Sequence, residues 1–179
     1  IYVGVMLSLI VYLMRTARPR ITSLVPDTNY ASRKLRAASS SEECPQLKIA
    51  QIDGSLFFGA VDHVQRNFRA FAEQNSQQKH LLLIGSGINF IDIAGAEMLL
   101  QEAARRRKAG GGLYVTKIKD EVCKILKRGD YLGRFGAENI FESKTEALHT
   151  IFEELDHERC ATCERRIFKE CASIKPAQE

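Results

Sequence analysis

The residues whose types and spacing could carry chemistry are concentrated in one glycine-rich segment, residues 85–95, which follows a short apolar run and precedes a helical pattern. A segment between a strand and a helix exposes backbone N–H groups in the positive field of the helix N-terminus, which suits anions and phosphates. The candidate binding residues in it are Ser86, Asn89, Asp92, Ala94 and Gly95. Asp92 is also suited to cap the helix that follows. A requirement for tight backbone geometry at the glycines explains the same composition without any ligand.

A second group of candidate ligands lies near the end of the sequence, where His157, Cys160, Cys163 and Cys171 fall within fifteen residues. Zinc accepts such ligands, but structural zinc sites more often use two paired C-x-x-C knuckles, and only one is present. Ile167 and Phe168 favour instead a short amphipathic segment with incidental thiols, and a redox-sensitive pair is a third alternative. We therefore expect no metal and no cofactor, with these four residues as the alternative metal set.

The remaining reactive side chains do not form a catalytic pattern. The histidines at positions 63, 80, 149 and 157 are scattered along the sequence, and neither a nucleophile elbow nor a Walker loop is present. Cys123 lies among helical core positions and is expected to be buried. We assign no catalytic residues and expect a protein that is not an enzyme.

The elements that must position these residues alternate between strands and helices. Strands are predicted at 21–25, 48–53, 80–84, 113–116 and 139–141, and helices from 61, from 92 to about 109, around 122–126 and after Ser143. Ser143 with Glu146 forms a capping box for the last helix. This order predicts an α/β domain, with a mainly parallel (mixed) sheet and packed helices, over residues 17–156. It includes a variable loop at 28–46 and is followed by a cysteine-containing tail, 157–179.

Composition and charge are those of a folded domain. The 179 residues are 45% hydrophobic and 27% charged, with a net charge of +4. Basic residues are scattered among acids rather than interleaved with aromatic residues, so no nucleic-acid partner is expected. The basic run 105–108 is predicted to be a solvated helix end. Residues 15–36 hold six Arg or Lys against one acid, an excess that anionic lipid would attract.

The first residues, 1–14, carry no charge but are fewer than the roughly 20 apolar residues of a membrane span. They could form a signal-peptide core, a buried helix, or the end of a spanning helix. Arg15, Arg18 and Arg20 follow the run directly, as at the cytoplasmic end of a span under the positive-inside rule. We therefore expect residues 1–16 to end a transmembrane helix of a longer protein, and a buried helix is the alternative.

Two segments carry a resemblance to a known family. Residues 52–60 (IDGSLFFGA) look like the strand-to-helix segment at the start of a STAS domain, and residues 88–95 (INFIDIAG) resemble its Asp-x-Ser/Thr-Gly motif. Together with the order of elements and the apolar, arginine-flanked start, they resemble the C-terminal STAS domain of SulP (sulfate permease) anion transporters. The resemblance covers roughly residues 1–156.

The resemblance implies a secondary-active, homodimeric transporter of inorganic anions or small carboxylates, of the sulfate or bicarbonate type. It implies an inner (plasma) membrane location with this domain in the cytoplasm, where it regulates transport or assembly. The implied partners are the membrane domain of the same transporter, a second copy, and an acyl carrier protein or another cytoplasmic protein. The glycine-rich segment would then be a docking surface.

The alternative within the same resemblance is a membrane-tethered signalling module of the anti-sigma-factor-antagonist kind. In those relatives the residue two after the motif aspartate is a serine that a kinase phosphorylates, but here it is Ala94, which has no hydroxyl. Ile84 also stands where many relatives carry an acid. Both departures weaken a phosphorylation switch or a nucleotide site.

Overall fold

The structure is a computed structural model that describes residues 2–27, 34–38 and 40–175. Its strands are β1 (Arg20–Pro26), β2 (Leu35–Ala37), β3 (Leu47–Leu56), β4 (His80–Ile84), β5 (Ile88–Ile91), β6 (Leu113–Thr116) and β7 (Ile140–Phe141). Its α-helices are α1 (Tyr2–Thr16), α2 (Phe58–Gln74), α3 (Ile93–Lys108), α4 (Asp120–Arg128), α5 (Tyr131–Phe135), α6 (Lys144–Glu154) and α7 (His157–Ala161). Short 3₁₀ turns η1 to η4 occupy Ser40–Glu42, Gly85–Gly87, Ala137–Asn139 and Lys169–Ser173.

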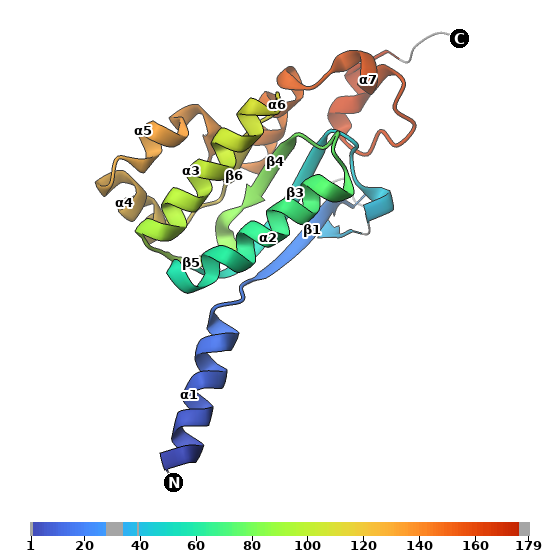
Figure 1. Cartoon of the computed structure of the whole chain (residues 1–179). Coiled ribbons are helices and arrows are strands. Elements are labelled where there is room, and N and C mark those ends of the chain that lie inside the picture. Colours follow the sequence, from blue (N-terminus) through green and yellow to red (C-terminus); the bar gives the residue numbers. More distant parts are fainter. Residues whose placement is uncertain (1, 28–33, 39, 176–179) are drawn as a thin grey trace.

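The strands form one mixed sheet in the order β2-β1-β3-β4-β6-β7, and β5 pairs separately with β3. β3, β4, β6 and β7 run parallel to one another, whereas β1 pairs antiparallel with both β2 and β3. The predicted mainly parallel sheet with packed helices is therefore confirmed. The antiparallel edge joins the domain directly to the segment that leaves α1 (Figure 1).

The central strand β4 shows how the sequence produces this layered fold. All five of its residues are buried, as expected for a strand covered on both faces. Because side chains alternate along a strand, Leu81 and Leu83 belong to one hydrophobic cluster, and Leu82 and Ile84 belong to the other. The sheet thus separates two cores.

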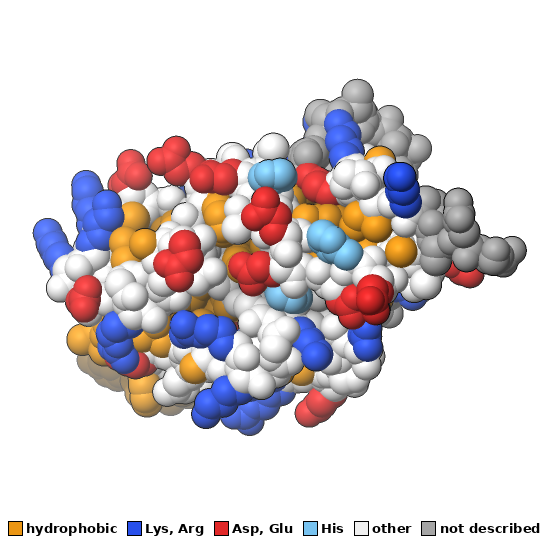
Figure 2. Space-filling view, turned by 90° about the horizontal axis from the view of Figure 1, so that it is seen from above, with side chains coloured by type: hydrophobic (Ala, Val, Ile, Leu, Met, Phe, Trp, Pro, Cys, Tyr) orange, Lys and Arg blue, Asp and Glu red, His pale blue; other side chains and the backbone are white. Residues whose placement is uncertain are grey.

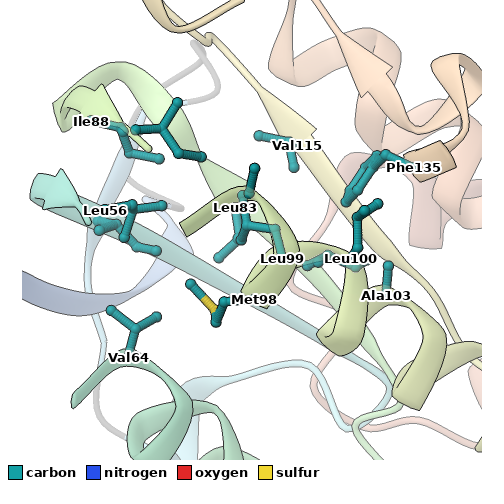
Figure 3. Packing of buried hydrophobic residues seen from close by; sticks show 14 of the residues in the cluster. Leu56, Val64, Leu83, Ile88, Met98, Leu99, Leu100, Ala103, Val115 and Phe135 are labelled. Carbon is teal, nitrogen blue, oxygen red and sulfur yellow. The ribbon is translucent and has the colours of Figure 1, made fainter. Parts of the chain in front are cut away.

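The larger core lies between the sheet and helices α2 to α5. Figure 3 shows Leu56, Val64, Leu83, Met98 and Val115 converging there from strands and helices. Residues at helical spacing on α2 and α3 supply much of it, as the sequence pattern predicted. The face of the domain seen from above in Figure 2 carries acidic and basic side chains interspersed with one another.

The smaller core lies on the other face of the sheet, under α6 and the C-terminal tail. Leu148, Ile151 and Phe152 of α6 are buried there, and Ser143 Oγ accepts a hydrogen bond from Glu146 N at 3.1 Å, which confirms the predicted cap. Phe168 of the tail packs edge-on against Phe152, with ring centroids 5.5 Å apart. The prediction that the tail packs as an apolar segment is confirmed.

Several short elements were not predicted, and β2, β5 and α5 are among them. β2 lies in the region expected to be a variable loop, of which residues 28–33 and 39 are outside the described part of the chain. β5 lies inside the glycine-rich segment, and α5 follows α4. Each is only three to five residues long, so each is too short to show a hydrophobic period. β3 also contains a bulge at Gly54, whose φ is +141°.

Helix α1 differs from every other helix because it projects away from the sheet (Figure 1). Its large apolar side chains are exposed all around the helix, from Tyr2 at 88% to Ile10 at 47%. Of the helices that the structure describes, none has the length and apolar character needed to cross a membrane.

Candidate functional site

The glycine-rich segment lies at the carboxyl end of β4 and is more ordered than the predicted loop. Gly85–Gly87 form η2, Ile88–Ile91 form β5 parallel to β3, and Asp92 begins α3 as its N-cap. Ser86 on η2 and Asn89 on β5 are exposed, and Ala94 in the first turn of α3 is partly exposed. The five predicted site residues therefore share one end of the domain but belong to three different elements.

Two glycines in this segment are required by close packing. A Cβ atom on Gly87 would lie 2.0 Å from Asp53 Oδ1, and one on Gly95 would lie 2.2 Å from the backbone oxygen of Leu56. Neither adopts a positive φ. The tight backbone expected from the sequence is therefore confirmed at these positions, and its cause is the approach of η2 and α3 to the end of β3.

The Asp92 carboxylate caps two helices. Its Oδ1 accepts a hydrogen bond from Gly95 N at 2.8 Å, which confirms the predicted cap of α3. Its Oδ2 accepts from Phe58 N at 2.9 Å, at the start of α2, whose own N-cap residue, Phe57, has no side-chain acceptor. The carboxylate already supplies negative charge to both helix N-termini, so the geometry does not favour an external anion there.

Asn89, another polar residue of the segment, also has a partner within the protein. Asn89 Oδ1 accepts a hydrogen bond from Lys119 Nζ at 2.7 Å, which links β5 to the residue that precedes α4. The side chains that sequence analysis proposed for binding thus mostly hold neighbouring elements together.

The apolar surface around Asp92 was not predicted from the sequence. Phe58, Phe90 and Ile93 are exposed by 81%, 47% and 70%, and we call these three residues the apolar patch. Among the described residues outside α1, they are the large apolar side chains with the greatest exposure. An apolar residue beside a helix start is ordinarily expected in a core, so only the fold shows that these three face solvent.

The apolar patch lies at the end of the domain from which α1 departs (Figure 1). Arg20, the first residue of β1, pairs with Asp53, and the neighbouring Gly54 pairs with Ile88 at the start of β5. His63 Nε2 of α2 also lies 3.2 Å from the backbone oxygen of Pro19. The residues that join α1 to β1 are thus held near α2 and β5, which carry Phe58 and Phe90 of the patch.

The cysteine-containing tail has a different arrangement. Cys160 and Cys171 are buried in the smaller core, and Cys163 is partly exposed. His157 Nε2 is 2.9 Å from the backbone oxygen of Phe152 and so has a partner of its own. Within the described residues, no three His, Cys, Asp or Glu side chains converge into a set that could hold a metal as they lie.

Burial perturbs the titratable groups on this side of the sheet. It raises the pKa of the Cys44 thiol to about 11 and also raises the pKa of Cys160 and Cys171. Burial also lowers the pKa of His80, whose Nδ1 is 3.1 Å from the Tyr114 hydroxyl; that hydroxyl donates to Glu154 Oε2 at 2.7 Å. These groups form the internal packing of the domain. Cys123, expected to be buried, is partly exposed on α4.

Comparison with known proteins gives the domain type. A family profile described as the STAS domain matches residues 39–147. A search of curated proteins finds no match to the sequence.

Solved structures share the fold at low sequence identity. The structure of SLC26A9 has a TM-score of 0.73 at 18% identity, and the match covers 88% of this chain and 28% of SLC26A9. The murine Slc26a9 anion transporter in the inward-facing state has a TM-score of 0.71 at 20% identity, and the match covers 85% of this chain and 25% of that transporter. A sulfate transporter family protein from Wolinella succinogenes has a TM-score of 0.52 at 22% identity, and the match covers 65% of this chain and 94% of that protein. The unphosphorylated anti-sigma factor antagonist SpoIIAA has a TM-score of 0.51 at 12% identity, and the match covers 63% of this chain and 94% of SpoIIAA. The chain spans about a quarter of the length of the SLC26A9 structures.

Proposed function

Because the chain belongs to the STAS domain family, we propose that it is the cytoplasmic regulatory and assembly domain of a secondary-active SulP-type transporter. The transporter moves inorganic anions of the sulfate or bicarbonate type, or small carboxylates, across the plasma membrane. The domain itself is non-catalytic in this proposal, and residues 1–16 end the last transmembrane helix.

The observation that carries the proposal is the direct fusion of α1 to the domain. A helix that is apolar on all sides is stable when lipid or protein surrounds it, and the side chains of α1 are exposed instead. Arg18 and Arg20 follow it at once, on the cytoplasmic side that the positive-inside rule predicts. An apolar helix that continues into a STAS domain is the arrangement expected of a transporter's C-terminal end.

The extent of the structural likeness supports the same assignment. The likeness to SLC26A9 covers 88% of this chain, whereas the likenesses to two anti-sigma factor antagonists, SpoIIAA and the protein from Mycobacterium paratuberculosis, cover 63% and 74%. The match to SLC26A9 thus includes a larger part of this chain. That larger match is expected if both domains are attached to a membrane protein in the same way. The residues that select the anion would lie in the preceding membrane domain.

The apolar patch is the surface that we propose for contact with that membrane domain. The elements that carry it lie next to the residues that join α1 to β1, and we therefore expect it to face the membrane domain. Its residues surround a carboxylate that is already hydrogen-bonded, which leaves hydrophobic contact as the main source of affinity. A homodimer and an acyl carrier protein, the other partners that the resemblance implies, remain part of the proposal.

Transport measurements test this function. We would compare uptake of labelled sulfate, bicarbonate and dicarboxylates by the full-length protein and by a version truncated after Arg20, with membrane abundance measured in parallel. A change in uptake at equal abundance is the expected result. If the intact protein moves none of these anions, the transporter assignment is wrong.

A signalling module of the anti-sigma-factor-antagonist kind is the alternative, since SpoIIAA shares the fold. Ala94 cannot accept phosphate, and the exposed Ser86 is the nearest hydroxyl in the segment. Mass analysis after incubation with candidate kinases separates the two functions, because phosphate on the glycine-rich segment would support the signalling module.

A further inference from the structure

Four cysteines from two distant parts of the sequence border one cavity. Cys44 precedes β3, whereas Cys160, Cys163 and Cys171 belong to the C-terminal tail, yet all four line a cavity with about 10 Å³ of free space. That space admits the centre of one water-sized atom or ion. We call these four residues the cysteine cluster. The sequence did not indicate it, because Cys44 is more than a hundred residues away from its partners.

We propose that the cysteine cluster is a structural site for one soft divalent metal ion, zinc, bound by four thiolates. Four sulfur ligands, two of them in a C-x-x-C pair, form the closed tetrahedral set that structural zinc sites use. Each bound thiol gives up its proton to solvent, and no electron is transferred.

Hydrogen-bond donors already point at the sulfurs, as they do in thiolate metal sites. The backbone of Gln46 and Leu47 acts to lower the pKa of Cys44, and that of Phe168 acts to lower the pKa of Cys171, although burial is the larger effect and raises both. Gln46 Nε2 donates to Cys160 Sγ at 3.2 Å. These donors stabilise negative charge on three of the four sulfurs.

Positive charge is also available where four thiolates would need it. A divalent ion with four thiolates carries two net negative charges, and Arg165 and Arg166 both line the cavity. The Nη1 atom of Arg166 is buried without a hydrogen-bond partner. A thiolate beside it would supply the missing acceptor.

The proposed set differs from the one that the sequence suggested. His157 was the fourth candidate ligand, but its Nε2 lies against the backbone oxygen of Phe152, and it does not line the cavity. Cys44 takes its place. The fold therefore replaces a mixed set of ligands from one short segment with four cysteines from two segments.

Small side-chain movements complete the site. As the side chains lie, no three ligands in the described residues converge on one point. Rotation about the Cα–Cβ bond carries a cysteine sulfur by about 3 Å from one rotamer to the next. Since all four cysteines already border one cavity, we expect such rotations to bring the sulfurs together without a change of fold.

The test uses the 179-residue chain, purified in detergent without a histidine tag from cells grown with added zinc. We expect about one zinc per chain by elemental analysis, and only Cys123 reactive toward a thiol reagent until a chelator removes the metal. Cobalt in place of zinc should give the visible bands of a tetrahedral thiolate complex. A disulfide between cluster cysteines, or all five thiols reactive with no metal bound, would overturn the proposal.

Variants identify the ligands. C44S and C163S should each lose the metal, while C123S and H157Q should retain it. C163S is the most informative because Cys163 is the least buried member of the cluster, so its loss leaves the core intact. Circular dichroism confirms that each variant is folded. Full zinc content in folded C44S or C163S would contradict the assignment.

Discussion

The two ends of this domain use polar side chains in opposite ways. At the end that holds the glycine-rich segment, Asp92 and Asn89 are bonded to neighbouring elements, and the exposed surface is the apolar patch. At the end that holds the tail, the reactive side chains are buried, and thiols, Gln46 and Arg166 share one cavity. An exposed apolar surface whose neighbouring polar groups are already hydrogen-bonded within the domain is suited to bind a partner protein. Buried thiols and polar side chains are suited to hold the tail against the domain.

The largest effect should come from Gly95→Val. The added side chain would overlap the backbone oxygen of Leu56, which cannot move without breaking the end of β3. We expect the free energy of unfolding to fall by about 3 kcal/mol, measured by urea denaturation. Gly4→Val is a useful control, because a Cβ there meets no atom within 4 Å and its φ is not positive. Equal losses in the two variants would refute the role of close packing.

Asp92→Ala should have the next largest effect, since it removes the cap of α3 and the acceptor for Phe58 N together. We expect a loss of about 2 kcal/mol, against about 1 kcal/mol for Ser143→Ala, which removes the cap of α6 alone. Thermal or urea unfolding measures both. If the two variants lose the same stability, Asp92 caps only one helix.

Gln46→Ala tests the attachment of the tail. Its side chain bonds to both the N and O atoms of Asp156 and to Cys160, so its loss leaves buried groups unsatisfied. We expect a loss of about 1 to 2 kcal/mol and faster protease cleavage within 157–175. Gln101→Ala, at a solvent-exposed position on α3, is the control, and equal cleavage of the two variants would show that Gln46 does not hold the tail.

A smaller effect should appear as pH falls. Burial lowers the pKa of His80, while Glu154 opposes the shift and Arg106 adds to it. The unfolded chain, with a histidine pKa of about 6.5, binds a proton before the folded one does. The contribution of His80 to the free energy of unfolding should therefore be fully present above the pKa of the unfolded chain. It should decline as the pH falls from that value through the pKa of His80 in the folded protein. His80→Gln should flatten this decline in urea unfolding at several pH values, and His149→Gln should not; identical slopes would contradict the assignment.

Much of the fold could be predicted because its main elements have clear periods. The buried run of β4 and the spacing along α2 and α3 identified strands and helices, and Asp92 and Ser143 were recognised as caps. Short elements such as β5 depend on tertiary pairing rather than on their own sequence.

The parts of the site that sequence could not indicate depend on contacts between distant residues. The second bond of Asp92 reaches Phe58, and Cys44 meets the tail only in the folded chain. Arg106, predicted to be solvated, is only 3% exposed, because Glu102 and the backbone oxygen of Lys79 accept its hydrogen bonds at 2.7 and 3.1 Å. A local charge pattern does not show such partners.

The proposed contact between the apolar patch and the membrane domain of the same protein can be tested directly. The test is anion uptake by the full-length protein carrying Phe58→Ser and Ile93→Ser together, compared with His149→Ser on the exposed side of α6. Because both patch residues are exposed, folding and membrane abundance should be preserved. We expect altered uptake per transporter in the patch variant alone, and unchanged uptake at equal abundance would contradict the proposed contact.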